Sequence, residues 1–320
     1  MRMKPRLVTA LVALVAVVAV TSLGGCGGTA APSSSTLDPS KDKLAQVLAR
    51  GTLVLFTDPD YAPQSFLVKG AARAAGTKCT ANQLTGAEIS GYDAETGKLV
   101  AAELGVEPCF VTPPFNEVIG GGWADRWDVA WGSGALTADR MTRLYVTQPY
   151  YSTPANFFVG KDSPVQSAAE LAGKKIGACA GCTHELYLKG QLTLPGEKLV
   201  VAVANPQIVT FASEKPGLEA LAKGDLDAFL CSEPVGAAKI KDGALALREI
   251  VTPAFTTQKT GYVDRSLTLN PVAFLDRINA ALHSLHASGK LKALSVQFFG
   301  VDYATTAAAF DLGSIGQKVP

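Results

Sequence analysis

Two cysteines and a histidine stand close together in the second half of the chain, at Cys179, Cys182 and His184. A Cys-x-x-Cys spacing suits three kinds of chemistry: a thiol redox couple, half of a metal site, or a local structural disulfide. A redox couple would need a thioredoxin-like surrounding sequence, which is missing, and zinc would need two further ligands that the neighbourhood does not offer. We therefore expect a disulfide between Cys179 and Cys182, and neither a metal site nor a cofactor.

The other cysteines suggest a second disulfide and a free thiol. Five cysteines follow Cys26, so at least one of them has no partner inside the chain. Cys79 lies in a polar insert over residues 69–90, and Cys109 begins an expected strand. We expect these two to pair, which leaves Cys231 unpaired.

The N-terminal residues resemble a bacterial lipoprotein signal, with basic residues, an apolar run from Leu7 to Val20 and the ending Leu23-Gly24-Gly25-Cys26. The run is shorter than the ~20 residues of a spanning helix, which favours a cleaved export signal. In lipoproteins of this type the cysteine is diacylated and becomes the first mature residue, and two acyl chains anchor stably. We expect a signal peptide over 1–25, lipidation of Cys26, and a flexible tether over 26–40, which is rich in small and polar residues.

Charge and length restrict what the exported body does. The chain has 29 Lys plus Arg against 28 Asp plus Glu, and the signal takes away only basic residues, so the remainder is slightly acidic. Nucleic acid is not an expected partner, because binding it requires a basic surface. No later apolar stretch reaches spanning length, so the body is not itself a permease. Its length exceeds one usual domain of ~100–200 residues, which favours two lobes.

From residue 41 onwards, short β-rich runs alternate with helical stretches that end at glycine. This alternation predicts an α/β fold with mainly parallel sheets and crossover helices. Helices are expected from a Ser40 cap to Arg50 and over 94–104, 183–188, 217–223, 271–287 and 290–299, and strands over 52–57, 109–112, 127–131, 175–179 and 226–231. Residues 132–135 (Gly-Ser-Gly-Ala) are expected to form a loop whose small residues let a ligand approach the backbone.

Five motifs, in order, are similar to those of the family 3 extracellular solute-binding proteins, the polar amino-acid receptors of ABC importers. They are LVLFTDPDYAPQSF (53–66), GYDAETGKLVAAELG (91–105), DVAWGSGALTADR with TQPYY (128–151), AGKKIGACAGCTHE (172–185) and GDLDAFLCSEP (224–234). The likeness covers about residues 41–303. It implies a two-lobed, type II periplasmic-binding-protein fold that closes on a small ligand, with one lobe formed by 41–150 plus 253–320 and the other by 151–252.

The resemblance also implies where the ligand carboxylate binds. Arg140 matches the arginine that holds the α-carboxylate, a role that suits a planar guanidinium with two parallel donors. Thr183 matches the residue whose main-chain N–H meets the same carboxylate from the second lobe, where a helix begins and favours an anion.

Three further residues match positions around the ligand side chain. Tyr61 matches the aromatic residue that lies over the ligand, and Phe115 occupies the facing apolar position. Asp58 matches a carboxylate that reaches the side-chain charge in binders of cationic amino acids. The alternative for Asp58 is a turn-forming role before Pro59.

Two departures from the family pattern affect the half of the site that holds the ligand ammonium. In the loop with Ser133, Ala135 stands where the family has Ser or Thr, and Ser232 stands where it has the Asp that neutralises the ammonium. A buried ammonium without a carboxylate is costly. Two explanations stay open: Glu233 supplies the charge from one position along, or the ligand has no free α-ammonium.

These observations favour a monomeric binding protein, anchored on the extracytoplasmic face of a membrane, that delivers a small carboxylate-bearing solute to an ABC permease. The solute is expected to be a polar amino acid or a derivative. Two alternatives are a cyclohexadienyl-dehydratase-like enzyme on the same scaffold and a sensor subunit for a membrane partner. No Gly-x-Ser-x-Gly or His-Glu-x-x-His motif supports an enzyme, so we do not expect one.

Overall fold

The computed structural model describes residues 38–319, so the expected signal peptide, Cys26 and most of the tether lie outside the described residues. The strands are β1 (Thr52–Phe56), β2 (Asp60–Tyr61), β3 (Ser65–Leu67), β4 (Leu84–Thr85), β5 (Ile89–Ser90), β6 (Glu107–Val111), β7 (Val129–Ala135), β8 (Leu144–Val146), β9 (Tyr151–Gly160), β10 (Lys175–Cys179), β11 (Gln207–Phe211), β12 (Ala228–Ser232) and β13 (Leu247–Asp264). The helices are α1 (Lys43–Arg50), α2 (Tyr92–Leu104), α3 (Phe115–Gly120), α4 (Thr183–Leu188), α5 (Glu214–Lys223), α6 (Glu233–Lys241), α7 (Val272–Ala287), α8 (Lys290–Phe299) and α9 (Thr305–Ala308), with 3-10 turns η1 (Arg140–Thr142), η2 (Ala168–Leu171) and η3 (Leu312–Ile315).

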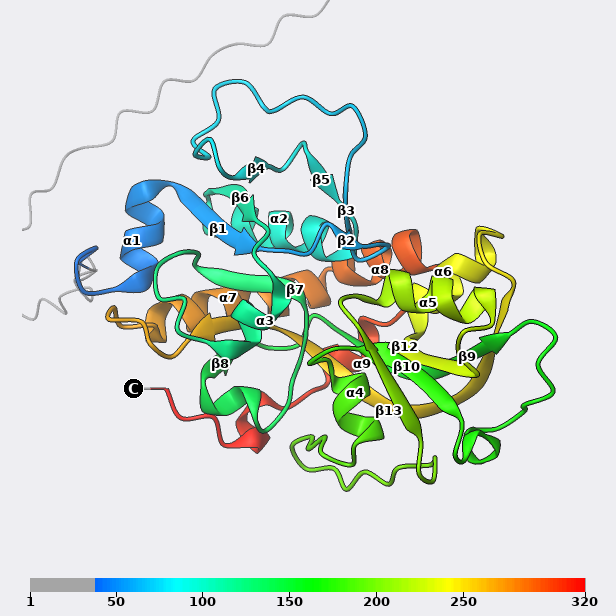
Figure 1. Ribbon diagram of the computed structural model, residues 1–320. Helices are drawn as coiled ribbons and strands as arrows, with labels where there is room; N and C mark the ends of the chain where they lie inside the picture. Colours follow the sequence, from blue (N-terminus) through cyan, green and yellow to red (C-terminus); the bar gives the residue numbers. More distant parts are fainter. Residues whose placement is uncertain (1–37, 320) are drawn as a thin grey trace, which may run out of the picture. The chain divides into compact units, whose positions relative to one another are not determined.

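One large sheet runs through the protein in the order β11-β10-β12-β9-β13-β7-β1-β6-β4, with β8 paired to β13 (Figure 1). In lobe 1, β1 pairs in parallel with β6 and β7, and helices α1, α2, α7 and α8 pack together around it. In lobe 2, β10 pairs in parallel with β11 and β12, and α4, α5 and α6 pack on these strands and on β9. The α/β, two-lobed prediction is therefore confirmed, while the expected lobe boundaries stay a prediction.

Two long antiparallel strands, β9 and β13, join the lobes. β9 also pairs with β12 of lobe 2, and β13 also pairs with β7 of lobe 1. Their pairing shifts register between Ile250 and Phe255. The expected lobe boundaries at 150/151 and 252/253 therefore fall at the start of β9 and within β13.

Strand β1 is buried between two apolar clusters of lobe 1, one on each face of the sheet. All five residues from Thr52 to Phe56 are buried. Leu53 and Leu55 belong to the apolar cluster with helices α2 and α7, whereas Val54 and Phe56 belong to a second cluster on the other face. A parallel strand covered on both faces needs such a continuous apolar run.

Helix α1 begins later than the sequence suggested. Its N-cap is Asp42, whose Oδ1 accepts a hydrogen bond from the Ala45 N–H at 3.0 Å, so the expected Ser40 cap is wrong. The hydroxyl of Ser40 is instead bound by Asp38 at 2.7 Å. Gly51 ends the helix with a φ of 72°, a left-handed conformation that glycine adopts without strain.

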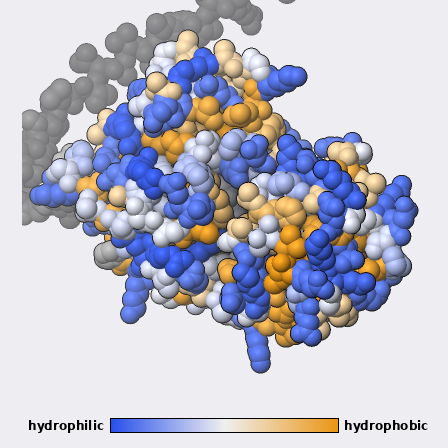
Figure 2. Space-filling view, in the orientation of Figure 1, coloured by the Kyte–Doolittle hydropathy of each residue, from blue (hydrophilic) through white to orange (hydrophobic). Residues whose placement is uncertain are grey.

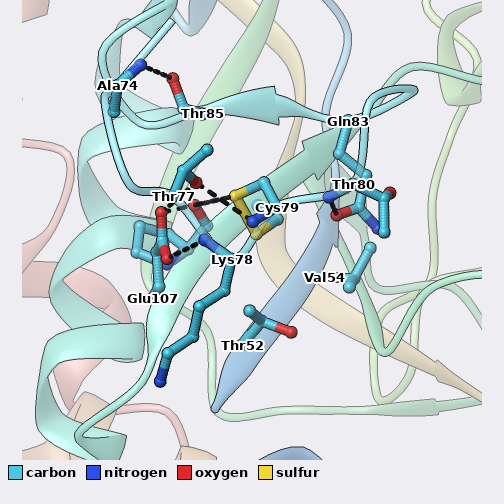
Figure 3. Close-up of a disulfide and its surroundings, with 12 residues drawn as sticks. Thr52, Val54, Ala74, Thr77, Lys78, Cys79, Thr80, Gln83, Thr85 and Glu107 are labelled. Atoms are coloured by element: carbon cyan, nitrogen blue, oxygen red, sulfur yellow. Dashed lines mark hydrogen bonds between the residues drawn. A yellow bond between two sulfur atoms is a disulfide. The ribbon is translucent and has the colours of Figure 1, made fainter. Parts of the chain in front are cut away.

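A disulfide ties the polar insert to lobe 1. Cys79 is bonded to Cys109 on β6, the pair expected from the sequence, and the Glu107 carboxylate accepts the Lys78 N–H at 2.8 Å and the Thr77 hydroxyl (Figure 3). The insert projects at the top of Figure 1, between β3 and β4. A second disulfide joins Cys179 and Cys182, and Cys231 is a buried free thiol.

Within residues 38–319, no helix is both long and apolar enough to cross a membrane. Hydrophilic side chains cover much of the face shown in Figure 2, with smaller apolar areas between them.

Candidate functional site

A cavity of about 570 Å³ is lined by residues from both lobes. Lobe 1 contributes the turn after β1, the segment that leads into α3 and the end of β7. Lobe 2 contributes the loop between β10 and α4 and the start of α5, and Lys259 of β13 also lines the cavity. This volume is in the range of small-molecule sites, which are ~300–1,000 Å³.

Arg140 presents a buried guanidinium to this cavity. It begins η1 and is 4% exposed. Its Nη1 donates to the Ala135 carbonyl at 3.2 Å and to the Tyr262 hydroxyl at 3.1 Å, and its Nη2 lies 3.5 Å from the Gly181 carbonyl of lobe 2. Its Cζ lies 5.5 Å from the centroid of the Phe115 ring. Arg140 therefore lies at the cavity, and its role in binding a carboxylate stays a prediction.

The expected loop over 132–135 is the end of strand β7, which is a correction. Strand β13 extends the pairing, with Lys259 opposite Ala135 and Thr260 opposite Gly134. The small residues are needed for packing, because a Cβ on Gly134 would lie 2.4 Å from the Tyr262 ring. Tyr262 thereby reaches Arg140.

Ser133 lines the cavity but its hydroxyl is already engaged. It has a φ of 55°, and its Oγ donates to Asp93 Oδ2 at 2.6 Å. Tyr150 donates to the other oxygen of Asp93 at 2.9 Å and accepts the Ser133 N–H at 2.9 Å. Burial raises the pKa of Asp93 to about 7. The serine therefore belongs to a buried lobe 1 network.

Tyr61, Asp58 and Thr183 also line the cavity. The Tyr61 hydroxyl donates to Ser232 Oγ at 3.2 Å, which links the two lobes. Asp58 forms a turn, accepting the Asp60 N–H at 3.0 Å, and burial raises its pKa. The turn-forming role of Asp58 is thus observed, and its contact with a ligand side chain stays a prediction. Thr183 begins α4, as expected.

The sequence model of the bacterial extracellular solute-binding proteins, family 3, matches residues 76–301. The chain belongs to this family. It is similar to the L-arginine-binding protein of Pseudomonas aeruginosa, with 25% identity over 67% of this chain and 81% of that protein. It is also similar to the L-cystine-binding protein TcyJ of Escherichia coli K12, with 23% identity over 81% of this chain and 86% of that protein.

Solved structures share the fold of this solute-binding protein. One is an ancestral amino acid-binding protein, a precursor of cyclohexadienyl dehydratase, with a TM-score of 0.65, 22% identity and coverage of 81% of this chain and 99% of that one. Another is the substrate-binding protein of an amino acid ABC transporter, with a TM-score of 0.62, 21% identity and coverage of 78% and 100%. The ancestral neighbour is itself a binding protein and gives no support to the dehydratase alternative.

Two expected ammonium-site residues of this solute-binding protein do not line the cavity. Ser232 is buried behind it and contacts Tyr61. Glu233 begins α6 and accepts a hydrogen bond from the Tyr303 hydroxyl. In this structure the first turn of α6 directs the Glu233 side chain to Tyr303, and its expected role as the counter-charge of a ligand ammonium stays untested.

Two buried ionisable residues of the cavity, Glu214 and Lys259, are not among the residues predicted from the sequence. Glu214 follows Ser213 at the first position of a helix, where an acidic residue is ordinarily exposed and favoured by the helix dipole. Lys259 lies in a β-rich run, and its direction depends on strand pairing. The available signal for Lys259 was a lysine within a long β-rich run. One sequence does not show that this run, and the lysine with it, is buried.

Burial controls the charge of the groups around Glu214. It raises the pKa of Glu214 to about 8, against the opposing effect of Lys259. His184 Nδ1 lies 3.5 Å from Glu214 Oε1, but burial, with Lys259 and Arg140 nearby, lowers the pKa of His184 to about 3. His184 is therefore neutral at physiological pH, and the contact is no ion pair.

The Cys179–Cys182 disulfide leaves no metal centre beside the cavity. The ligand-type atoms of Cys179, Cys182 and His184 lie within 4.8 Å of one another. Metals bind thiolates, however, and both sulfur atoms are used in the disulfide. The bond instead holds the turn that leads into Thr183.

The raised pKa of Glu214 predicts a pH-dependent effect on stability. Its pKa is about 8 in the folded protein against 4.5 for a free side chain, so in this interval the folded state binds more protons and ionisation destabilises it as pH rises. Glu214→Gln removes this penalty. The free energy of unfolding of the ligand-free variant, minus that of the wild type, should increase from about pH 5 to about pH 8 in urea denaturation. A difference that stays constant over this interval would contradict the prediction.

Proposed function

We propose that the protein is the substrate-binding subunit of an ABC importer and captures an amino acid in the cleft between its lobes. The observation that carries this proposal is the buried guanidinium of Arg140, which faces a cavity lined from both sides of the cleft. A guanidinium offers paired donors that match a carboxylate. Membership of a solute-binding family supports a role in capture rather than catalysis.

The carboxylate would lie between Arg140 of lobe 1 and Thr183 of lobe 2, so a bound ligand would contact both lobes. Closure would follow, because a ligand that touches both halves stabilises the closed state. Phe115 and Tyr61, both half-buried at the cavity, would cover its apolar part.

A thermal-shift screen of amino acids, their derivatives and simple carboxylates tests the function. A ligand present at a hundred times its dissociation constant adds about 2.7 kcal/mol of stability. We expect at least one amino acid to raise the melting temperature and the matching amine without the carboxyl group to have no effect. If no carboxylate stabilises the protein, the proposed function fails.

We further propose that the protein works as a lipid-anchored monomer on the extracytoplasmic face of the membrane. The support is the Leu23-Gly24-Gly25-Cys26 ending and the extracellular family. Because an acylated cysteine holds the chain at the membrane, Cys26→Ser should release the protein or leave an unprocessed precursor. Membrane fractionation and mass spectrometry of the N-terminus measure this. An unmodified N-terminus cut at another position in the native protein would refute the anchor.

A further inference from the structure

Two buried ionisable side chains in the cleft have no role in the carboxylate site described above. Lys259 is 3% exposed and Glu214 is 4% exposed, and both line the cavity. Within residues 38–319, no ion pair of 4.0 Å or less joins Lys259 to any carboxylate. A buried charge without a partner is costly unless a ligand supplies one. Both groups therefore point to charged groups on the ligand.

Glu214 lies near the position where the family has its ammonium-binding Asp. The main-chain N–H of Ser232, which replaces that Asp, lies close enough to favour the ionised form of Glu214. Oε2 of Glu214 is buried and has no hydrogen-bond partner among the described residues. A ligand ammonium at this oxygen would complete its hydrogen bonding and replace the lost carboxylate of residue 232.

Lys259 belongs to the same part of the cleft as Arg140. It is paired with Ala135 in the strand register, and Arg140 donates to the Ala135 carbonyl. Burial lowers the pKa of Lys259 to about 8; the Glu214 charge opposes this shift, and the Arg140 charge adds to it. If the ligand α-carboxylate pairs with Arg140, the positive charge of Lys259 still needs a counter-charge.

Glu214 and Asp93 are the carboxylates whose charge raises the pKa of Lys259. Asp58 lines the same cavity, but among the described residues none of these three forms an ion pair of 4.0 Å or less with Lys259. Glu214 would be occupied by the ligand ammonium, and His184 is neutral. Asp93 is buried nearby, but its two oxygens accept hydrogen bonds from Ser133 and Tyr150 and it forms no ion pair within 4.0 Å among the described residues. The remaining counter-charge has to come from the ligand.

We propose that the ligand is an amino acid with an acidic side chain, whose ammonium binds Glu214 and whose second acidic group binds Lys259. This inference rests on the proposed function and narrows it to a substrate class. A cationic side chain would place a third positive charge in the cavity beside Arg140 and Lys259, where the cavity carboxylate Asp58 already accepts the Asp60 N–H and has a pKa raised by burial. A neutral side chain would leave Lys259 buried without a partner.

Isothermal titration calorimetry on the full-length chain in detergent micelles, with L-glutamate and L-glutamine, tests the inference. The two ligands differ in the charge of one side-chain group. Loss of one member of a buried charge pair costs at least about thirtyfold in affinity, and we expect wild-type protein to prefer glutamate by that factor. Lys259→Met should bring the two affinities within about threefold of each other, by weakening glutamate alone.

Three other variants separate the effect of the Lys259 and Glu214 charges from a general disturbance of the structure. Lys259→Arg should keep most of the preference, because the charge remains. Lys198→Met, a control on the exposed surface, should behave like the wild type. Glu214→Gln should weaken L-glutamate strongly but leave glutarate, which lacks the ammonium, nearly unchanged.

The outcomes distinguish this inference from the proposed function. If L-glutamine or L-arginine binds at least as tightly as L-glutamate and the binding requires Arg140, the inference is overturned and the function stands. A glutamate preference that persists in Lys259→Met also overturns it. If no amino acid binds, both fail.

Discussion

Arg140→Ala is expected to remove nearly all ligand binding. The guanidinium is buried in the cleft and is positioned by Ala135 and Tyr262, so a carboxylate bound there would lose its buried counter-charge. Such a loss costs about 2 to 5 kcal/mol, which is about thirtyfold to several thousandfold in the dissociation constant. Calorimetry with the most stabilising ligand of the thermal-shift screen measures the effect.

The fold should survive this change. The Ala135 carbonyl keeps its hydrogen bond from the Tyr262 hydroxyl when the arginine is removed. Arg143→Ala is the matched control, because Arg143 is three residues away and pairs with Asp139 on the surface. Arg140→Lys should give an intermediate affinity, since the charge remains but the parallel donors are lost. Unchanged binding by Arg140→Ala would show that the carboxylate site is elsewhere.

Asp128→Ala is expected to cause the largest loss of stability. The Asp128 side chain is fully buried, and Oδ1 lies 2.8 Å from Nζ of the fully buried Lys43. Its Oδ2 accepts the Val54 N–H at 2.7 Å and contacts Arg50. Removing one member of a buried ion pair costs about 3–5 kcal/mol when the other charge is left without a partner. Lys43 keeps Asp125 at 2.8 Å, so we expect the lower end of this range. Urea denaturation gives the difference in the free energy of unfolding.

Two further variants locate the cause. Asp128→Asn keeps an acceptor for Val54 and should lose less stability than the alanine. Glu117→Gln breaks a partly exposed pair with Arg126 at 2.8 Å and should change stability by less than ~1 kcal/mol. If Asp128→Ala lies within ~1 kcal/mol of the wild type, the ion pair does not stabilise lobe 1 as described.

Local signals in the sequence predicted most elements well. Strand Lys175–Cys179 and helix Thr183–Leu188 have the expected bounds, since an apolar run, a turn and a helix start follow one another within a few residues. Gly105 ends α2 as expected. Its left-handed conformation terminates a helix through local geometry, so the sequence alone can show it.

Errors occurred where the answer depends on distant strands. Residues 132–135 were expected to be a loop, but β13 pairs with them and continues β7. The same strand aims Lys259 into the cavity, and no local pattern shows the direction of that side chain. Of the expected ligand-binding residues, those in the motifs around Asp58, Ser133, Arg140 and Thr183 reach the cavity, because each follows a strand of the large sheet or lies at its end. Glu233 does not, and Glu214 went unnoticed.

Strand β13 carries Lys259 and is also one of the two connections between the lobes, which would bend in the proposed closure. Under these proposals, selectivity and mechanics share one segment of backbone. A designer who exchanges Lys259 to obtain a sensor for another metabolite therefore changes a residue of a connecting strand, and should measure the opening motion together with the preference. Changes of specificity that leave the response kinetics intact are better sought at Glu214, which lies on a helix of one lobe.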